Sequence, residues 1–351
     1  MELGRRAFLM GLGAFSGAGM LPISGGVENV RIPGKAWAVL LHMGTNMWCD
    51  KVPARWGNCD TPEKLALVGQ ADHFRFYEEL WREYTGRMVS RGLNMVVIDV
   101  GEAVVYPSHP ELGVKGSWTP DRLMTEVARL RKMGLEPIPK LNFSTAHDTW
   151  LKEYGRMVST QKYYQVCRDV IRDVCEIFDH PRWFHLGYDE ETANHQSQYE
   201  FAVVRQGELW WHDFLFFVKT VEDLGMRPWI WSDFYWHHPD DFLRRMPRSV
   251  LQSNWYYAAA FEDAKDFAKK RVQAYVDLDK AGFDQMPCGS NWSCDENFGN
   301  TVKYCAKNIS AKSLSGFLMA PWYFTVPVHR EKVLQGIDIA GAAKQLAIWG
   351  V

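Results

Sequence analysis

The sequence lacks a strong excess of charge of either sign and lacks the common motifs for binding phosphate, nucleotides or metals. Of its 351 residues 23% are charged, and the formal net charge is −2. No phosphate-binding loop, dinucleotide fingerprint, His-Glu-x-x-His or Cys-x-x-Cys occurs. Nucleic acid needs a basic surface and a structural metal needs regularly spaced ligands. We therefore expect no nucleic-acid partner, no metal and no cofactor.

Cysteines are few and odd in number, seven in all. At least one must stay free or pair between chains. Cys49 and Cys59 fall in the same predicted loop, so they are the pair in which a disulfide is expected if the protein carries one. Most of the thiols are expected to be small buried apolar groups.

An apolar run at the N-terminus stands apart from the rest of the pattern. Arg5-Arg6 is followed by a Gly- and Ala-rich stretch to about Leu21, which is short for a membrane span of about 20 residues. This arrangement is similar to a twin-arginine export signal. We expect residues 1–30 to be signal and linker, residues 31–351 to be the functional domain, and the mature protein to be periplasmic or extracellular without a membrane span. An uncleaved anchor or a helical extension is the alternative.

Apolar, β-rich runs alternate with helical stretches eight times after this segment. The helical stretches carry the expected punctuation, such as Thr119-Pro120 before one helix and Gly134 after it. Eight such units predict a single-domain α/β fold, the closed parallel (β/α)8 or TIM barrel. The expected strands are Trp37–Met43, Asn94–Val100, Glu136–Phe143, Trp183–Gly187, Arg227–Ser232, Val250–Tyr256, Gln285–Trp292 and Gly316–Tyr323.

Acidic residues gather where the fourth expected strand runs out into a loop. An apolar strand pattern comes first, and Asp189, Glu190 and Glu191 follow it. The carboxyl ends of barrel strands form the active-site face. Glycoside cleavage needs an acid that protonates the leaving oxygen and a second group that meets the positive charge at the anomeric carbon. Glu190 is the predicted acid, and the neighbouring Asp189 is expected to raise its pKa.

The chain resembles glycoside hydrolase family 20, the β-N-acetylhexosaminidases, over roughly residues 90 to 235. That family's motif reads His-hydrophobic-Gly-Gly-Asp-Glu, and this chain has His185-Leu186-Gly187-Tyr188-Asp189-Glu190. Asn94–Asp99, followed by Tyr106-Pro107 and Pro110-Glu111-Leu112, looks like the family's second strand and the loop after it. Gly134–His147 is similar to its third strand.

The resemblance implies retaining, substrate-assisted hydrolysis of a terminal β-N-acetylhexosaminide. Glu190 would be the general acid/base, and Asp189 would orient the 2-acetamido group, whose carbonyl oxygen is the nucleophile. The chain departs from the family at Tyr188, where a phenol ring replaces a glycine and is expected to hinder close backbone approach. We expect Glu191 at the surface, and His185 either beside a catalytic carboxylate or in the core.

Polar and aromatic residues follow the other expected strands and would meet at the same face of the barrel. Sugar hydroxyls need convergent donors and acceptors, while the apolar faces of the sugar stack on aromatic rings. The candidate substrate-binding residues are His185, Asp99, Glu102, Lys140, Asn142, His147, Trp231, Asp233, Asn254, Trp255, Asn291, Trp292, Trp322 and Tyr323.

The sequence therefore predicts an exported barrel that acts on a carbohydrate by glycoside hydrolysis. Asp233 or Glu102 is the alternative nucleophile, for a sugar without an acetamido group, although a solvated loop acid is the default for Glu102. A carbohydrate-binding barrel without catalysis is the alternative from another class, because fold alone does not fix function.

Overall fold

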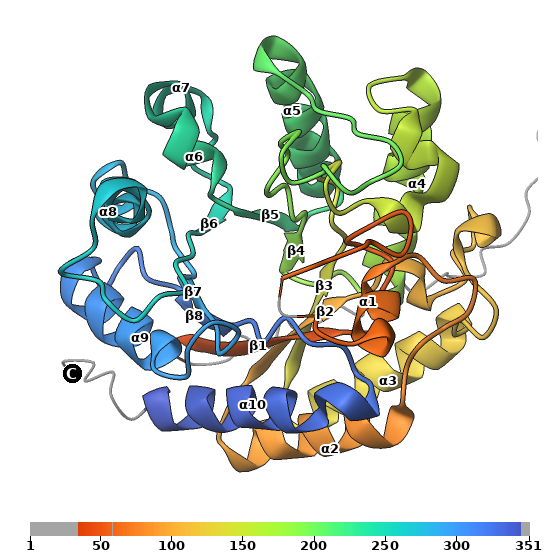
Figure 1. The fold of residues 1–351 in the computed structure, drawn as a ribbon, viewed down its shortest axis with the longest axis horizontal. Coiled ribbons are helices and arrows are strands. Elements are labelled where there is room, and N and C mark those ends of the chain that lie inside the picture. The colour runs from red at the N-terminus through yellow and green to blue at the C-terminus, as the bar shows by residue number, and fades with distance from the viewer. Residues whose placement is uncertain (1–33, 58, 345–351) are drawn as a thin grey trace, which may run out of the picture. The chain divides into compact units, whose positions relative to one another are not determined.

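The computed structural model describes residues 34–57 and 59–344. The described residues from Lys35 onward form one compact unit, and its eight parallel strands run in the order β6-β5-β4-β3-β2-β1-β8-β7 (Figure 1). The predicted (β/α)8 barrel is confirmed, whereas the predicted export signal lies outside the described residues. The strands are β1 (Ala36–His42), β2 (Met95–Asp99), β3 (Glu136–Lys140), β4 (Trp183–His185), β5 (Arg227–Trp231), β6 (Leu251–Ser253), β7 (Cys288–Gly289) and β8 (Gly316–Met319).

The barrel closes between β6 and β7 through isolated bridges. Gln252 pairs with Gln285, and Trp255 pairs with Cys288. The sequence predicted a long seventh strand, but β7 has only two residues. Pro287 directly precedes it and has no N–H to donate, which shortens the regular ladder.

Helices surround the sheet, as Figure 1 shows. Thr119 illustrates how they begin: its side chain accepts from Arg122 N–H at 3.3 Å, and Pro120 occupies the first turn of α3. The α-helices are α1 (Pro62–Val68), α2 (Glu78–Ser90), α3 (Pro120–Lys132), α4 (Gln161–Ile177), α5 (Gly207–Asp223), α6 (Phe234–His237), α7 (Pro239–Arg245), α8 (Asp266–Lys280), α9 (Asn297–Asn308) and α10 (Arg330–Lys344), with 3₁₀ turns η1 (Gly101–Ala103), η2 (Pro110–Leu112), η3 (Thr149–Arg156) and η4 (Pro327–His329).

The strands are buried on both faces, as expected for a parallel sheet covered by helices. Every residue of β1 and β2 is buried. Among the described residues no helix combines the length and the apolar character that crossing a bilayer requires. Cys49 and Cys59 are both free thiols, so the disulfide considered for this pair is not formed.

Candidate active site

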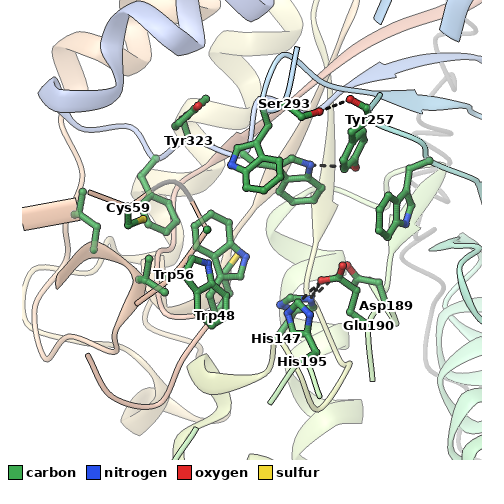
Figure 2. Close-up of a pocket in the computed structure, with 18 of the residues that line it drawn as sticks. Trp48, Trp56, Cys59, His147, Asp189, Glu190, His195, Tyr257, Ser293 and Tyr323 are labelled. Carbon is green, nitrogen blue, oxygen red and sulfur yellow. Dashed lines mark hydrogen bonds and ion pairs between the residues drawn. The ribbon is translucent and has the colours of Figure 1, made fainter. Parts of the chain in front are cut away.

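A pocket of about 840 Å³ lies where the strands give way to their carboxyl-end loops (Figure 2). Its volume is in the range of small-molecule sites. Many of the predicted site residues line it, namely Lys140, Asn142, His147, Asp189, Glu190, Trp255, Trp292, Trp322 and Tyr323. With Trp48 from the loop after β1, six of the eight strand ends contribute to one cavity, and this convergence supports a ligand-binding role.

The turn after β4 has an unusual backbone. Gly187, Tyr188 and Glu190 all have positive φ, at 69°, 72° and 56°. A Cβ on Gly187 would lie 2.0 Å from Asn142 Oδ1, so only glycine allows the two segments to approach this closely. Non-glycine residues rarely adopt such angles, and backbone strain of this kind is concentrated at functional sites.

Tyr188 does not obstruct the pocket, contrary to the expectation from the sequence. Its ring is 2% exposed and packs edge-on against Trp210 and Phe214 of α5, with both centroid distances 5.2 Å. The positive φ turns the side chain into the layer between sheet and helix. The phenol therefore replaces a glycine without filling the space in front of Asp189 and Glu190.

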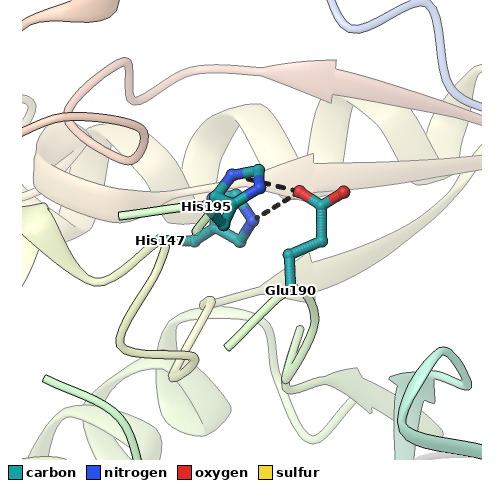
Figure 3. A group of neighbouring side chains, drawn as sticks. All are labelled: His147, Glu190 and His195. Atoms are coloured by element: carbon teal, nitrogen blue, oxygen red, sulfur yellow. Dashed lines mark ion pairs between the residues drawn. The ribbon is translucent and has the colours of Figure 1, made fainter. Parts of the chain in front are cut away.

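Asp189 and Glu190 face the pocket from this turn (Figure 2). Asn142 Nδ2 donates to Asp189 Oδ1 at 2.8 Å. Glu190 Oε2 lies 3.4 Å from His147 Nε2 and 3.2 Å from His195 Nε2, as Figure 3 shows. One acid is thus held by an amide, and the other by two imidazoles.

The electrostatics of Glu190 differ from the sequence-based prediction. Burial raises the pKa of Glu190, but the ion pair with His147 and the nearby His195 outweigh burial, and the net shift is downward. The predicted rise in its pKa is therefore wrong. Burial opposes the charged form of His147, but Asp189 and Glu190 raise its pKa overall. Burial lowers the pKa of His195.

Asp233 binds the backbone of Glu190. Its Oδ2 accepts from Glu190 N–H at 2.9 Å, and its Oδ1 has no hydrogen-bond partner among the described residues. Burial, followed by Asp189 and Glu190, raises the pKa of Asp233 to about 8. Asp233 does not line the pocket. This position suits a group that fixes the Glu190 backbone better than a group that attacks a sugar.

Two further predicted acids are also buried away from the pocket. Asp99 forms a buried ion pair with Lys140 inside the barrel. Glu102 is fully buried and accepts from Thr45 N–H at 2.7 Å and from Asn46 N–H at 3.1 Å, so it fixes the loop after β1. The expectation of a solvated Glu102 is wrong, because these two amides require a carboxylate inside the fold.

Four other predicted residues do not line the pocket. His185 accepts from Gly187 N–H at 3.0 Å through Nδ1, and its ring lies 4.5 Å from that of Trp231 in the barrel interior. Asn254 accepts from Trp236 Nε1–H at 2.8 Å. Asn291 donates to the Lys332 carbonyl at 2.9 Å. His185, Asn254 and Asn291 thus bond to groups within the fold, whereas Trp231 packs against the His185 ring.

The predicted surface position of Glu191 is wrong. Its side chain is 4% exposed and forms a two-point ion pair with Arg205, with Nε–Oε1 at 2.8 Å and Nη2–Oε2 at 2.6 Å. Arg205 also donates to the Phe143 carbonyl at 2.7 Å. The pair therefore ties the loop after β4 to the loop after β3, and these are the two loops that carry Glu190 and His147.

Several pocket residues were not predicted from the sequence. His195 lies well beyond β4 in an irregular loop, and Arg271 lies in the middle of α8, where its guanidinium is 4.4 Å above the Trp236 ring. Trp48 and Trp56 come from the long loop after β1, and Tyr257 follows β6. Aromatic residues in long loops at the carboxyl-end face are a signal that would have identified the last three.

Aromatic residues after β6 and β8 form a connected group in the pocket. Tyr257 stacks on Trp255 with a centroid distance of 5.0 Å, and its hydroxyl accepts from Trp322 Nε1–H at 3.0 Å. Trp322 has a positive φ of 62°. These rings offer an apolar face and a hydroxyl to a ligand opposite the carboxylates.

Comparison with known proteins gives matches in structure only. No family model matches the chain, and no curated protein matches its sequence. The fold is similar to that of a family 20 exo-β-N-acetylglucosaminidase from Vibrio harveyi, with 13% identity and a TM-score of 0.58, over 90% of this chain and 55% of that one. The chain thus spans little more than half of that protein.

Two other solved structures show the same likeness. A β-hexosaminidase from Streptomyces plicatus matches over 88% of this chain and 64% of its own, with 13% identity and a TM-score of 0.57. Dispersin B matches over 78% of this chain and 96% of its own, with 13% identity and a TM-score of 0.52. The fold of this chain is therefore a (β/α)8 barrel of the kind found in family 20 glycoside hydrolases.

Proposed function

We propose that the protein is a glycoside hydrolase that releases a terminal β-N-acetylhexosamine by retaining, substrate-assisted catalysis. The observation that carries this proposal is the adjacent pair Asp189 and Glu190, facing an aromatic pocket at the carboxyl ends of the strands. The Streptomyces plicatus protein of similar fold was solved with its product, N-acetylglucosamine. The proposal assigns the same class of sugar to this pocket.

Glu190 protonates the glycosidic oxygen, and Asp189 orients the acetamido group of the substrate. The carbonyl oxygen of that group attacks the anomeric carbon, and Glu190 then accepts a proton from the water that resolves the intermediate. Asn142 holds Asp189 in place through its 2.8 Å hydrogen bond. Because the histidines lower the pKa of Glu190, its protonated form is populated in acidic solution, so an acidic pH optimum is expected.

The two-carboxylate alternative has weaker support. It needs a second acid facing the sugar, but neither Asp233 nor Glu102 lines the pocket. A carbohydrate-binding role without turnover is favoured by one observation, the lowered pKa of Glu190, since an ionised carboxylate has no proton to donate.

The test is turnover of matched aryl β-glycosides with and without a 2-acetamido group. We expect hydrolysis only of the acetamido sugar, with a loss of at least about 100-fold in Glu190→Gln. Glu208→Gln, which changes an exposed acid on α5, is the matched control and should behave as wild type. Hydrolysis of the plain hexoside would overturn substrate assistance, and sugar binding without hydrolysis would establish the binding role instead.

A further inference from the structure

His147, Glu190 and His195 bring two imidazole nitrogens and a carboxylate oxygen within 4.8 Å of one another. The nitrogens lie 3.4 Å and 3.2 Å from the same atom, Glu190 Oε2 (Figure 3). In a tetrahedral zinc site, bonds of about 2.0 to 2.1 Å place the ligand atoms roughly 3.3 to 3.4 Å apart. The spacing of both histidines from the carboxylate therefore matches the spacing of ligand atoms around zinc.

The histidine nitrogens contact only carboxylates among the described residues: besides Glu190, His147 Nε2 lies 3.5 Å from Asp189 Oδ2. Nε2 of His147 and Nε2 of His195 are buried and form no hydrogen bond within the part of the chain that the structure describes. The side chain of His147 is 6% exposed and that of His195 is 26% exposed. Buried polar atoms without a partner destabilise a fold, and a bound cation would satisfy both nitrogens at once.

The loop that carries His195 is fixed in position. The next residue, Gln196, is 1% exposed, donates to the Val203 carbonyl at 2.8 Å and accepts from Val203 N–H at 2.7 Å. His195 N–H donates to Thr192 Oγ1 at 3.1 Å. The ring of Trp56 lies edge-on at 5.9 Å from the imidazole. The ligand geometry is thus built by the surrounding structure, as in preorganised metal sites.

We propose that His147, Glu190 and His195 bind a divalent transition metal ion, with zinc as the best fit. Two imidazoles and one carboxylate are ligands that zinc accepts, whereas magnesium and calcium prefer oxygen alone. All three residues line the pocket, so a remaining coordination position of the ion faces a bound ligand.

The site has a consequence that rests on the proposed function. The ion would bind Glu190 in its ionised form, which has no proton to donate in glycoside cleavage. Zinc is therefore expected to inhibit hydrolysis, and substrate and metal would compete for the same carboxylate. Glu190 would then serve two roles that exclude each other.

The experiment is calorimetric titration of zinc chloride into the full-length protein after treatment with a chelator. We expect one ion per chain, with binding weakened by at least about 100-fold in His195→Ala and His147→Ala, since even changes outside the ligand set cost 10- to 100-fold. His237→Ala removes an exposed imidazole on α6 and is the matched control. Cobalt titration with visible absorption reports whether the coordination is tetrahedral.

The outcomes separate this site from the proposed hydrolysis. Absence of zinc binding, or binding that His195→Ala leaves unchanged, would overturn the metal site. If the protein binds zinc but hydrolyses no glycoside, the proposed function is overturned and the metal site is supported. Where wild type hydrolyses the acetamido glycoside, zinc should inhibit it, and the inhibiting concentration should rise in His195→Ala by the same factor as the dissociation constant.

Discussion

Asn142, which follows β3, bonds to Asp189, which follows β4, through a 2.8 Å hydrogen bond from Nδ2 to Oδ1. The other end of the same amide accepts from Tyr188 N–H at 3.1 Å. One side chain therefore fixes both a pocket carboxylate and the strained backbone beside it. In the proposed reaction this bond keeps Asp189 aligned with the acetamido group.

Replacing Asn142 should impair catalysis through Asp189. A hydrogen bond to a charged group contributes about 1.5 to 3 kcal/mol, so Asn142→Ala should lower kcat/KM by about 10- to 100-fold on the acetamido glycoside. Asn142→Asp keeps the acceptor for Tyr188 N–H but places a second carboxylate against Asp189. We expect this variant to lose more activity and less stability than Asn142→Ala. Wild-type kinetics in both variants would remove Asn142 from the mechanism.

Gly187 should be required for the turn to form. In Gly187→Ala the new methyl group would meet Asn142 Oδ1 at 2.0 Å, in addition to the cost of a positive φ. Gly207→Ala is a matched control, because Gly207 also has positive φ but a methyl group added there would have no atom within 4 Å. Overpacking typically costs about 1 to 3 kcal/mol, so urea unfolding should show Gly187→Ala to be less stable than the control by about 2 kcal/mol. Equal stabilities would show that Asn142 moves aside at no cost.

The barrel and its acids were predictable because they depend on short segments of sequence. The apolar pattern that ends in Asp189 and Glu190 predicts both the strand and the position of the acids, since burial and strand end are local properties. Asn142 lines the pocket for the same reason, because it lies at the carboxyl end of a predicted strand. These are features that neighbouring residues along the chain determine.

The remaining features depend on contacts between distant residues. Glu191 looks like a surface acid because its partner, Arg205, lies at the far end of the same loop. His195 lies outside any strand or helix pattern in the sequence. Its place beside Glu190 depends on the hydrogen bond between Gln196 and Val203, which no local sequence pattern predicts. The lowered pKa of Glu190 could not be predicted without these two histidines, His147 and His195.

The buried pair of Glu191 and Arg205 should contribute strongly to stability. Glu191→Ala leaves the Arg205 guanidinium buried without its main partner, and breaking such a pair costs about 3 to 5 kcal/mol. The exposed pair of Glu208 and Arg245 provides the control, because Glu208→Ala removes an ion pair that solvent screens and should leave the midpoint of urea unfolding unchanged. A small effect of Glu191→Ala would mean that water replaces the carboxylate.

The pH dependence of hydrolysis should show the effect of the two histidines on the pKa of Glu190. The acid must be protonated, so the alkaline limb of kcat/KM follows the pKa of Glu190 in the free enzyme. His147 and His195 lower that pKa, and the limb of wild type should therefore lie in the acidic range. In His195→Ala one of the two imidazoles that lower the pKa of Glu190 is gone, that pKa rises, and the limb should move to higher pH. His237→Ala should leave the profile in place, and an unchanged profile in His195→Ala would show that Glu190 is not the group whose protonation limits the rate.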